Sequence, residues 1–186
     1  MRNIVPAILA LAAAGCVSAY TGSARPADPS VLSEPGWNAV RDVPVILQAS
    51  ERDCGAAAMA MVLGFFGEKL DPATLASPRA DALRDFARSR GFEAFVVPAS
   101  LEDLEGELRD GRPVLVGVIK PQIGGDVAHY EVVVGIDRSG DRIATHDPAR
   151  GLTVNSLGGF EREWEPTQRL AIVIAPKETR GRNPSR

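Results

Sequence analysis

Residues 48–66 read QASERDCGAAAMAMVLGFF, and this stretch decides the fold. Every side chain over 55–66 is small or apolar, so a helix formed here is apolar on all faces and belongs in the core. Gly67 follows as a C-cap residue. Cys54 then stands at the first turn, where unpaired N–H groups and the helix dipole favour a thiolate over a thiol. The stretch therefore predicts a buried helix that presents a reactive cysteine.

The flanking segments predict an α+β fold. A short strand is expected over 43–47, and a surface helix over 77–90, with Ser77 as its N-cap and Pro78 at its first position. A second helix over 100–109 has capping-box spacing. Further strands are expected over 92–97, 113–119, 130–136, 142–146, 152–155 and 170–175. This order is typical of helices, one of them buried, packed on a C-terminal antiparallel sheet.

The N-terminus carries the parts of an export signal in the usual order. Arg2 supplies a charge, an apolar run follows over 4–14, and small residues precede Cys16. The run is too short to span a bilayer as a permanent helix. Residues 13–16 (AAGC) resemble a bacterial lipobox, in which the cysteine takes a diacylglycerol and becomes the new N-terminus. We expect a lipoprotein of the bacterial cell envelope that faces the periplasm, with the outer membrane favoured; an ordinary cleaved signal is the alternative.

Composition divides the chain into four parts. We expect a lipoprotein signal peptide (1–15), a flexible tether rich in Ser, Ala, Pro and Gly (16–39), one folded domain (40–176) and a disordered basic tail (177–186). The net charge is −3, and acidic and basic residues are mixed throughout, which argues against nucleic-acid binding. A lipid on one of the two cysteines would leave the other unpaired in an oxidising compartment, and this favours a chemical role for that thiol.

Four further residues are candidates for a site around Cys54. A thiolate needs a partner that exchanges a proton near neutral pH, and the chain has only His129 and His146. His129 opens a strand and is favoured as the base, whereas His146 is the alternative if the register is shifted by one residue. Asp147 ends a neighbouring strand and is expected to orient the imidazole. Gln48, with the Cys54 backbone N–H, is expected to stabilise an oxyanion.

These motifs resemble a known family. Gln48 with DCGA at 53–56, AHY at 128–130 and HDP at 146–148 is similar to the bacteriocin-processing cysteine peptidases, which cut double-glycine leaders at the front of certain ABC exporters. The resemblance runs from residue 43 to residue 175. It implies a papain-like fold and four roles: nucleophile Cys54, base His129, orienting acid Asp147 and oxyanion-hole residue Gln48.

The expected function is that of an exported, lipid-anchored cysteine peptidase. Its substrate is a peptide or protein, and the resemblance suggests cleavage after glycine residues. Two alternatives remain: a non-catalytic peptide-binding module with the same fold, and a thiol enzyme that passes the acyl group to an amine. A cysteine at the start of an apolar helix is by itself more often a core residue. The spacing of the cysteine and the histidines matches no zinc pattern, so no metal and no cofactor are expected.

Overall fold

An eight-stranded antiparallel sheet forms the centre of the computed structural model, which describes residues 20–75 and 79–177. The strands are β1 (Arg25–Pro26), β2 (Asn38–Ala39), β3 (Phe92–Pro98), β4 (Val114–Lys120), β5 (Val127–Asp137), β6 (Arg142–Asp147), β7 (Gly151–Ser156) and β8 (Leu170–Pro176). Seven of them lie in the order β1-β7-β6-β5-β4-β8-β3, and β2 pairs with β5. The predicted α+β class is confirmed.

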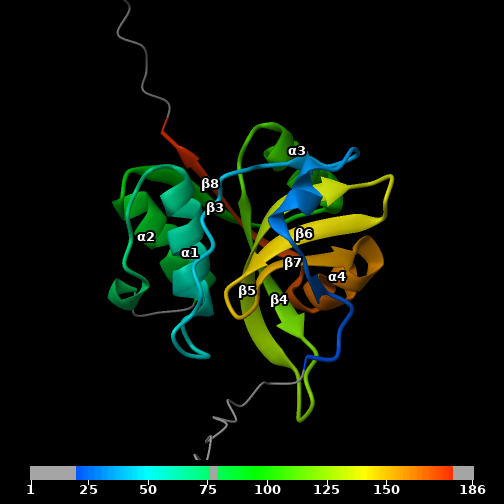
Figure 1. Cartoon of the computed structure of the whole chain (residues 1–186). Coiled ribbons are helices and arrows are strands. Elements are labelled where there is room, and N and C mark those ends of the chain that lie inside the picture. The colour runs from blue at the N-terminus through cyan, green and yellow to red at the C-terminus, as the bar shows by residue number, and fades with distance from the viewer. Residues whose placement is uncertain (1–19, 76–78, 178–186) are drawn as a thin grey trace, which may run out of the picture.

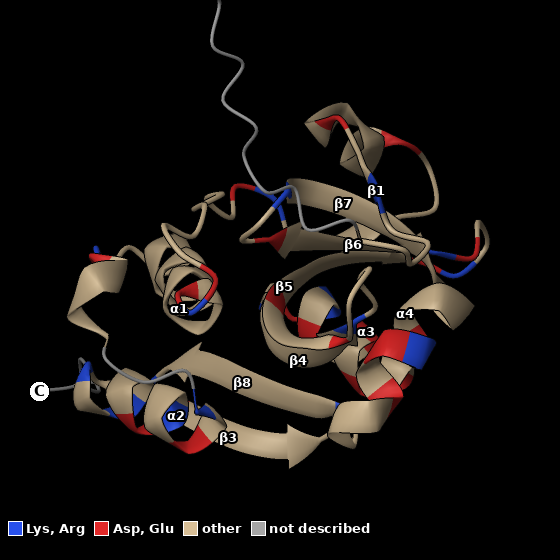
Figure 2. Ribbon diagram, turned by 90° about the horizontal axis from the view of Figure 1, so that it is seen from below, with Lys and Arg blue, Asp and Glu red and all other residues tan. Residues whose placement is uncertain are grey.

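Helices cover both sides of this sheet. The described residues form four α-helices: α1 (Cys54–Phe65), α2 (Ala80–Ser89), α3 (Leu101–Arg109) and α4 (Leu157–Trp164). Short 3-10 helices lie at Pro29–Ser33, Pro72–Thr74 and Glu165–Thr167. Figure 1 shows α1 and α2 on one side of the molecule and α4 on the other, and Figure 2 shows the same arrangement from below. No described helix is both long and apolar enough to cross a membrane.

Helix α1 is the buried helix that the sequence predicts. All ten residues of its first part, from Cys54 to Leu63, are buried. A large apolar side chain such as Met59 contributes roughly 1.5–3 kcal/mol when it is removed from water. Gly55 allows the helix to approach β5 closely, because a β-carbon there would lie 3.2 Å from the Tyr130 ring. These contacts fix the N-terminus of α1, and with it Cys54, against β5.

The predicted tether is wrong for residues 20–39. Strand β1 pairs with β7, β2 pairs with β5, and Leu32 between them is buried in the core. Tyr20 bridges Gln122, next to the turn that joins β4 and β5. The sequence does not predict these strands, because a two-residue strand is too short to show a hydrophobic period. Residues 1–19, which include the predicted signal peptide and Cys16, lie outside the described residues, as do 178–186 of the predicted tail.

Three further elements differ from their predictions. Residues 43–47 form no strand; Val45 and Leu47 there are exposed. Helix α2 begins at Ala80, after an N-cap position at Arg79, while Ser77 and Pro78 lie outside the described residues. Helix α4 was absent from the predicted elements because two glycines near its start give little helical signal, although Ser156 caps it through the Gly159 N–H. By contrast, the capping box at the start of α3 is confirmed.

Candidate active site

Cys54 is the first residue of α1 and lines a cavity of about 640 Å³. It is 5% exposed and is the free cysteine of the described residues. The cavity runs between the start of α1 and β5, and apolar side chains such as Leu75, Val118 and Leu170 form much of its lining. A peptide chain in this cavity would therefore pass the sulfur atom.

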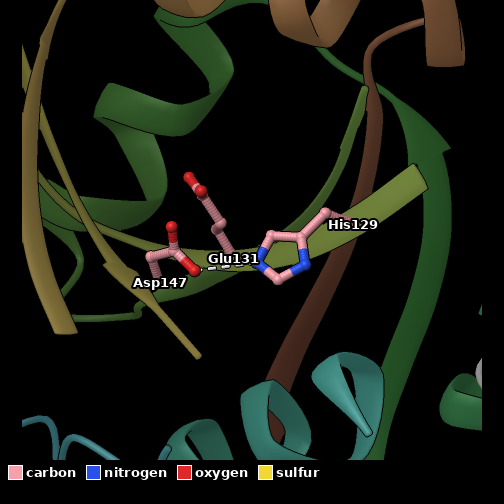
Figure 3. A group of neighbouring side chains, drawn as sticks. All are labelled: His129, Glu131 and Asp147. Carbon is pink, nitrogen blue, oxygen red and sulfur yellow. Dashed lines mark hydrogen bonds and ion pairs between the residues drawn. The ribbon is translucent and has the colours of Figure 1, made fainter. Parts of the chain in front are cut away.

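His129 and Asp147 come together from neighbouring strands. His129 lies on β5 and Asp147 ends β6, and the His129 Nε2 to Asp147 Oδ1 distance is 2.8 Å. Figure 3 shows the other ring nitrogen on the opposite side of the imidazole. That nitrogen, Nδ1, is the one left to face the Cys54 thiol, with which the His129 side chain is hydrogen bonded. The geometry therefore aligns a thiol, an imidazole and a carboxylate.

The turn after β6 holds the Asp147 carboxylate in place. The Ala149 N–H donates to Asp147 Oδ1 at 2.8 Å, and Arg150 Nε donates to Oδ2 at 2.8 Å. Burial raises the pKa of Asp147. The hydrogen bond and charge of His129, and then the hydrogen bond from Arg150, lower it by more, so the net pKa is well below its usual range. Asp147 is thus a carboxylate throughout the physiological range.

The environment favours a thiolate and imidazolium pair. Burial raises the pKa of the Cys54 thiol, but the hydrogen bond and charge of His129 and the Tyr130 and Gly55 backbone groups outweigh it, so the net pKa is lowered. Burial lowers the pKa of His129, whereas its hydrogen bonds to Asp147 and Cys54 raise it, to about 9. A lowered thiol pKa beside a raised imidazole pKa is the pattern of an activated cysteine nucleophile.

His146 does not take the position of the base. Successive residues of a strand point to opposite faces, and on β6 it is Asp147 whose side chain meets His129. His146 is 6% exposed and pairs with Val132 on the neighbouring strand. Burial lowers the pKa of His146, and its hydrogen bond to the Pro44 backbone raises it less. His146 is therefore a buried neutral imidazole.

Gln48 lies beside the site, in the segment that leads to Cys54. Its backbone N–H donates to the Pro148 carbonyl at 2.8 Å, which fixes it to the turn after Asp147. It lines a second cavity of about 460 Å³, together with His129 and Asp147. The Gln48 Oε1 atom is buried without a hydrogen-bond partner among the described residues. The oxyanion role of Gln48 stays a prediction.

Five charged or polar residues near the site did not figure in the predicted set. They are Tyr20, Lys120, Glu131, Arg150 and Glu163. One of them had a signal in the sequence: Glu131 interrupts the otherwise apolar run of β5, where a charge is costly unless it is paired. The others could not be found in this way, because they come together from β4, α4, a turn and the N-terminal segment.

The group His129, Glu131 and Asp147 also has the donor types of a metal site. One nitrogen and two carboxylate oxygens lie within 4.8 Å of one another. Figure 3 shows the three side chains. However, Lys120 Nζ lies 2.5 Å from Glu131 Oε1, and Arg150 binds Asp147. With the imidazole protonated as well, side chains of the protein already neutralise both carboxylates, and the arrangement does not fit a metal ion.

Comparisons with known proteins agree on one family. The Peptidase_C39 like family matches residues 40–172. The transport/processing ATP-binding protein ComA of Streptococcus pneumoniae is 32% identical over 138 residues, which are 69% of this chain and 18% of ComA. The pediocin PA-1 transport/processing ATP-binding protein PedD of Pediococcus acidilactici is 33% identical over 137 residues, again 69% of this chain and 18% of PedD. The chain thus spans less than a fifth of each relative.

Solved structures show the same fold. The peptidase domain of Streptococcus ComA aligns with a TM-score of 0.60 and 27% identity, over 73% of this chain and 99% of that domain. A double glycine motif protease from an AMS/PCAT transporter, solved with its leader peptide, aligns with a TM-score of 0.59 and 22% identity, over 74% of this chain and 94% of that one. The second likeness concerns the fold alone.

Proposed function

Because the chain belongs to the Peptidase_C39 like family and is a cysteine peptidase, we propose that it cleaves peptide bonds after glycine residues through a thioester on Cys54. One observation carries this proposal: Cys54 begins α1 beside His129, whose Nε2 lies 2.8 Å from Asp147. The names of the relatives, a transport/processing protein and a transport/processing protein for pediocin PA-1, support a peptide substrate.

The geometry suits a two-step reaction. The Cys54 thiolate attacks the carbonyl carbon of the peptide bond, and the C–N bond breaks as the His129 imidazolium gives its proton to the leaving nitrogen. The Cys54 N–H and the Gln48 amide are proposed to stabilise the oxyanion in between. The neutral imidazole then takes a proton from water, which attacks the thioester and releases the acid and the thiolate. Asp147 keeps the ring oriented in both steps.

Fast alkylation at low pH tests the activated thiolate. In the full chain carrying Cys16→Ser, Cys54 is the only thiol. At pH 6 a free cysteine is about 0.3% thiolate, so we expect iodoacetamide to label folded Cys54 at least about tenfold faster than free cysteine. Mass spectrometry of the labelled peptide gives the rate. The same protein in urea serves as the control and should lose this advantage; a folded rate equal to that of free cysteine would contradict the proposal.

We further propose that the protein is exported and anchored to a membrane, with the outer membrane favoured, by a lipid on Cys16. The lipobox-like residues 13–16 support this, and they follow an apolar run of the length found in export signals. In a Gram-negative host, Cys16→Ser is expected to move the protein from the membrane fraction to the soluble fraction. The matched variant Cys54→Ser should stay in the membrane fraction. A Cys16→Ser protein that remains membrane-bound would rule out the anchor.

A further inference from the structure

A second carboxylate lies beside the His129 ring and has no part in the mechanism above. Glu131 is two residues after His129 on β5, so both side chains lie on the same face of the sheet. A Glu131 carboxylate oxygen lies within 4.8 Å of a ring nitrogen and of an Asp147 oxygen, and Figure 3 shows the Glu131 side chain extending past Asp147. Glu131 is 1% exposed. A carboxylate buried this deeply takes up a proton unless a cation is close to it.

Lys120 supplies this cation. Its side chain is also buried, and Nζ lies 2.5 Å from Glu131 Oε1 and 2.8 Å from Glu163 Oε2. Burial lowers the pKa of the Lys120 ammonium, but the charges of the two glutamates raise it, and the net pKa lies above its usual value. Lys120 is therefore charged, and its ammonium pairs with both buried glutamates.

Tyr20, in the N-terminal segment, contacts both Glu163 and Arg150. Its hydroxyl donates to Glu163 Oε1, and its ring stacks against the Arg150 guanidinium, 4.0 Å from the ring centre. Arg150 in turn binds Asp147. Both carboxylates beside His129 are thus supported, through Lys120 and through Arg150, by contacts that meet at Tyr20.

We propose that Glu131 is a positioning residue of the active site: paired with Lys120 and lying close to both His129 and Asp147, it acts with Asp147 to stabilise the His129 imidazolium. This inference rests on the proposed role of His129 as the proton donor and base. The Glu131 charge is one of the causes that raise the pKa of His129. In this view the N-terminal segment belongs to the active site, because Tyr20 covers the buried charges that surround the imidazole.

Several groups together set the charge state of His129. Cys54 faces it from α1, Asp147 from β6 and Arg150 from the turn after β6. The other titratable or charged groups around the site are Glu131 on β5, Lys120 on β4, Glu163 on α4, Tyr20 in the N-terminal segment and Glu51 in the loop before α1. The test therefore changes one charge and measures the imidazole itself.

An NMR titration of the two histidines separates these contributions. The chain contains only His129 and His146, so two imidazole signals report the whole titration. In the full chain with Glu131→Gln, the loss of one nearby negative charge should lower the pKa of His129 by about one unit. Glu131→Asp keeps the charge one methylene further away and should give a smaller fall. The His146 signal is an internal control and should not move.

Asp137→Asn is the matched control variant. Asp137 is also buried, also lies on β5 and also pairs with a cation, Arg142 at 2.7 Å, but it stands at the other end of the strand. This variant should lower the melting temperature without changing the His129 titration. An unchanged His129 pKa in folded Glu131→Gln would overturn the inference, as would an equal shift in Asp137→Asn.

The titration also keeps this inference apart from the proposed function. If Glu131→Gln shifts the His129 pKa but wild-type Cys54 shows no fast alkylation and no peptide cleavage, the proposed function fails and the role of Glu131 in the charge state of His129 stands. If the wild type cleaves peptides and the shift is absent, only the inference fails. Should Glu131→Gln not fold, Glu131→Met removes the same charge with an apolar side chain of similar length and provides the same test, and an unchanged His129 pKa in that variant would overturn the inference.

Discussion

Replacing Cys54 by alanine is expected to abolish peptide cleavage, with a fall in kcat/KM of about 10⁴-fold or more. No other thiol lies in the described residues, so nothing in the site can form the thioester in its place. Alanine is a strong helix former and fits the first turn of α1, so the fold should be retained. The measurement is mass spectrometry of a peptide library that includes double-glycine sites.

The products and a second variant make this result decisive. Cys54→Ser keeps the shape of the side chain, but its hydroxyl does not ionise beside the imidazolium, so it should be as inactive as Cys54→Ala. A product with a free carboxyl group identifies hydrolysis, whereas a product joined to an added amine identifies acyl transfer. Retained cleavage in Cys54→Ala would show that the nucleophile is another group. A wild-type protein that binds library peptides without cutting them would instead be a binding module.

Asp147→Asn is expected to lower kcat/KM by about 10²-fold or more, because the variant removes the charge that orients and stabilises the His129 imidazolium. The side chain keeps its size, and the Ala149 N–H still has an oxygen to bond. The pH profile should change as well: the alkaline limb, which reports loss of the His129 proton near 9, should move toward the ordinary histidine value of about 6.5. A kcat/KM profile from pH 5 to 10 measures both effects.

The direction of the pH effect on stability follows from the same pKa. The folded-state pKa of His129 is raised to about 9, so its ion pair with Asp147 contributes fully to stability below pH of about 6.5 and is lost as the pH rises through 9. Thermal unfolding of Asp147→Asn should therefore lose this dependence. Asp137→Asn, which removes a buried acid far from His129, should retain both the activity and the alkaline limb. Equal activity in Asp147→Asn and wild type would remove Asp147 from the mechanism.

Local sequence signals were sufficient for the elements that hold the catalytic pair. The run after Cys54 is apolar on all faces, and this predicts the buried helix α1 without reference to the rest of the chain. The β-branched runs predict β4, β5 and β8. Choosing between His129 and His146 required the pairing register of the strands, because a shift of one residue moves every side chain of a strand to the opposite face of the sheet.

What the sequence did not predict depends on contacts between distant elements. Strand β1 pairs with β7 at the edge of the sheet, and β2 pairs with the last residues of β5, which extend beyond β4; no pattern within two residues predicts either pairing. The contact between Lys120 and Glu163 joins β4 to α4 across 43 positions. Among the site residues that were not predicted, only Glu131 gives a signal in the local sequence, because it is a charged residue in an apolar strand. Its partners become visible when the fold brings them together.

Because Tyr20 docks at the turn between β4 and β5, a lipid on Cys16 would hold the folded domain close to the membrane. Only four peptide units separate Cys16 from Tyr20, which span at most about 14 Å when fully extended. A lipid on Cys16 would therefore keep the catalytic centre near the bilayer surface, whereas a long flexible linker would let it move away. Peptides that themselves associate with that surface would meet it at a raised local concentration, and a freely diffusing peptide would not. With such a short connection, peptides at the membrane surface would reach the active site more often than peptides in solution, whatever their sequence.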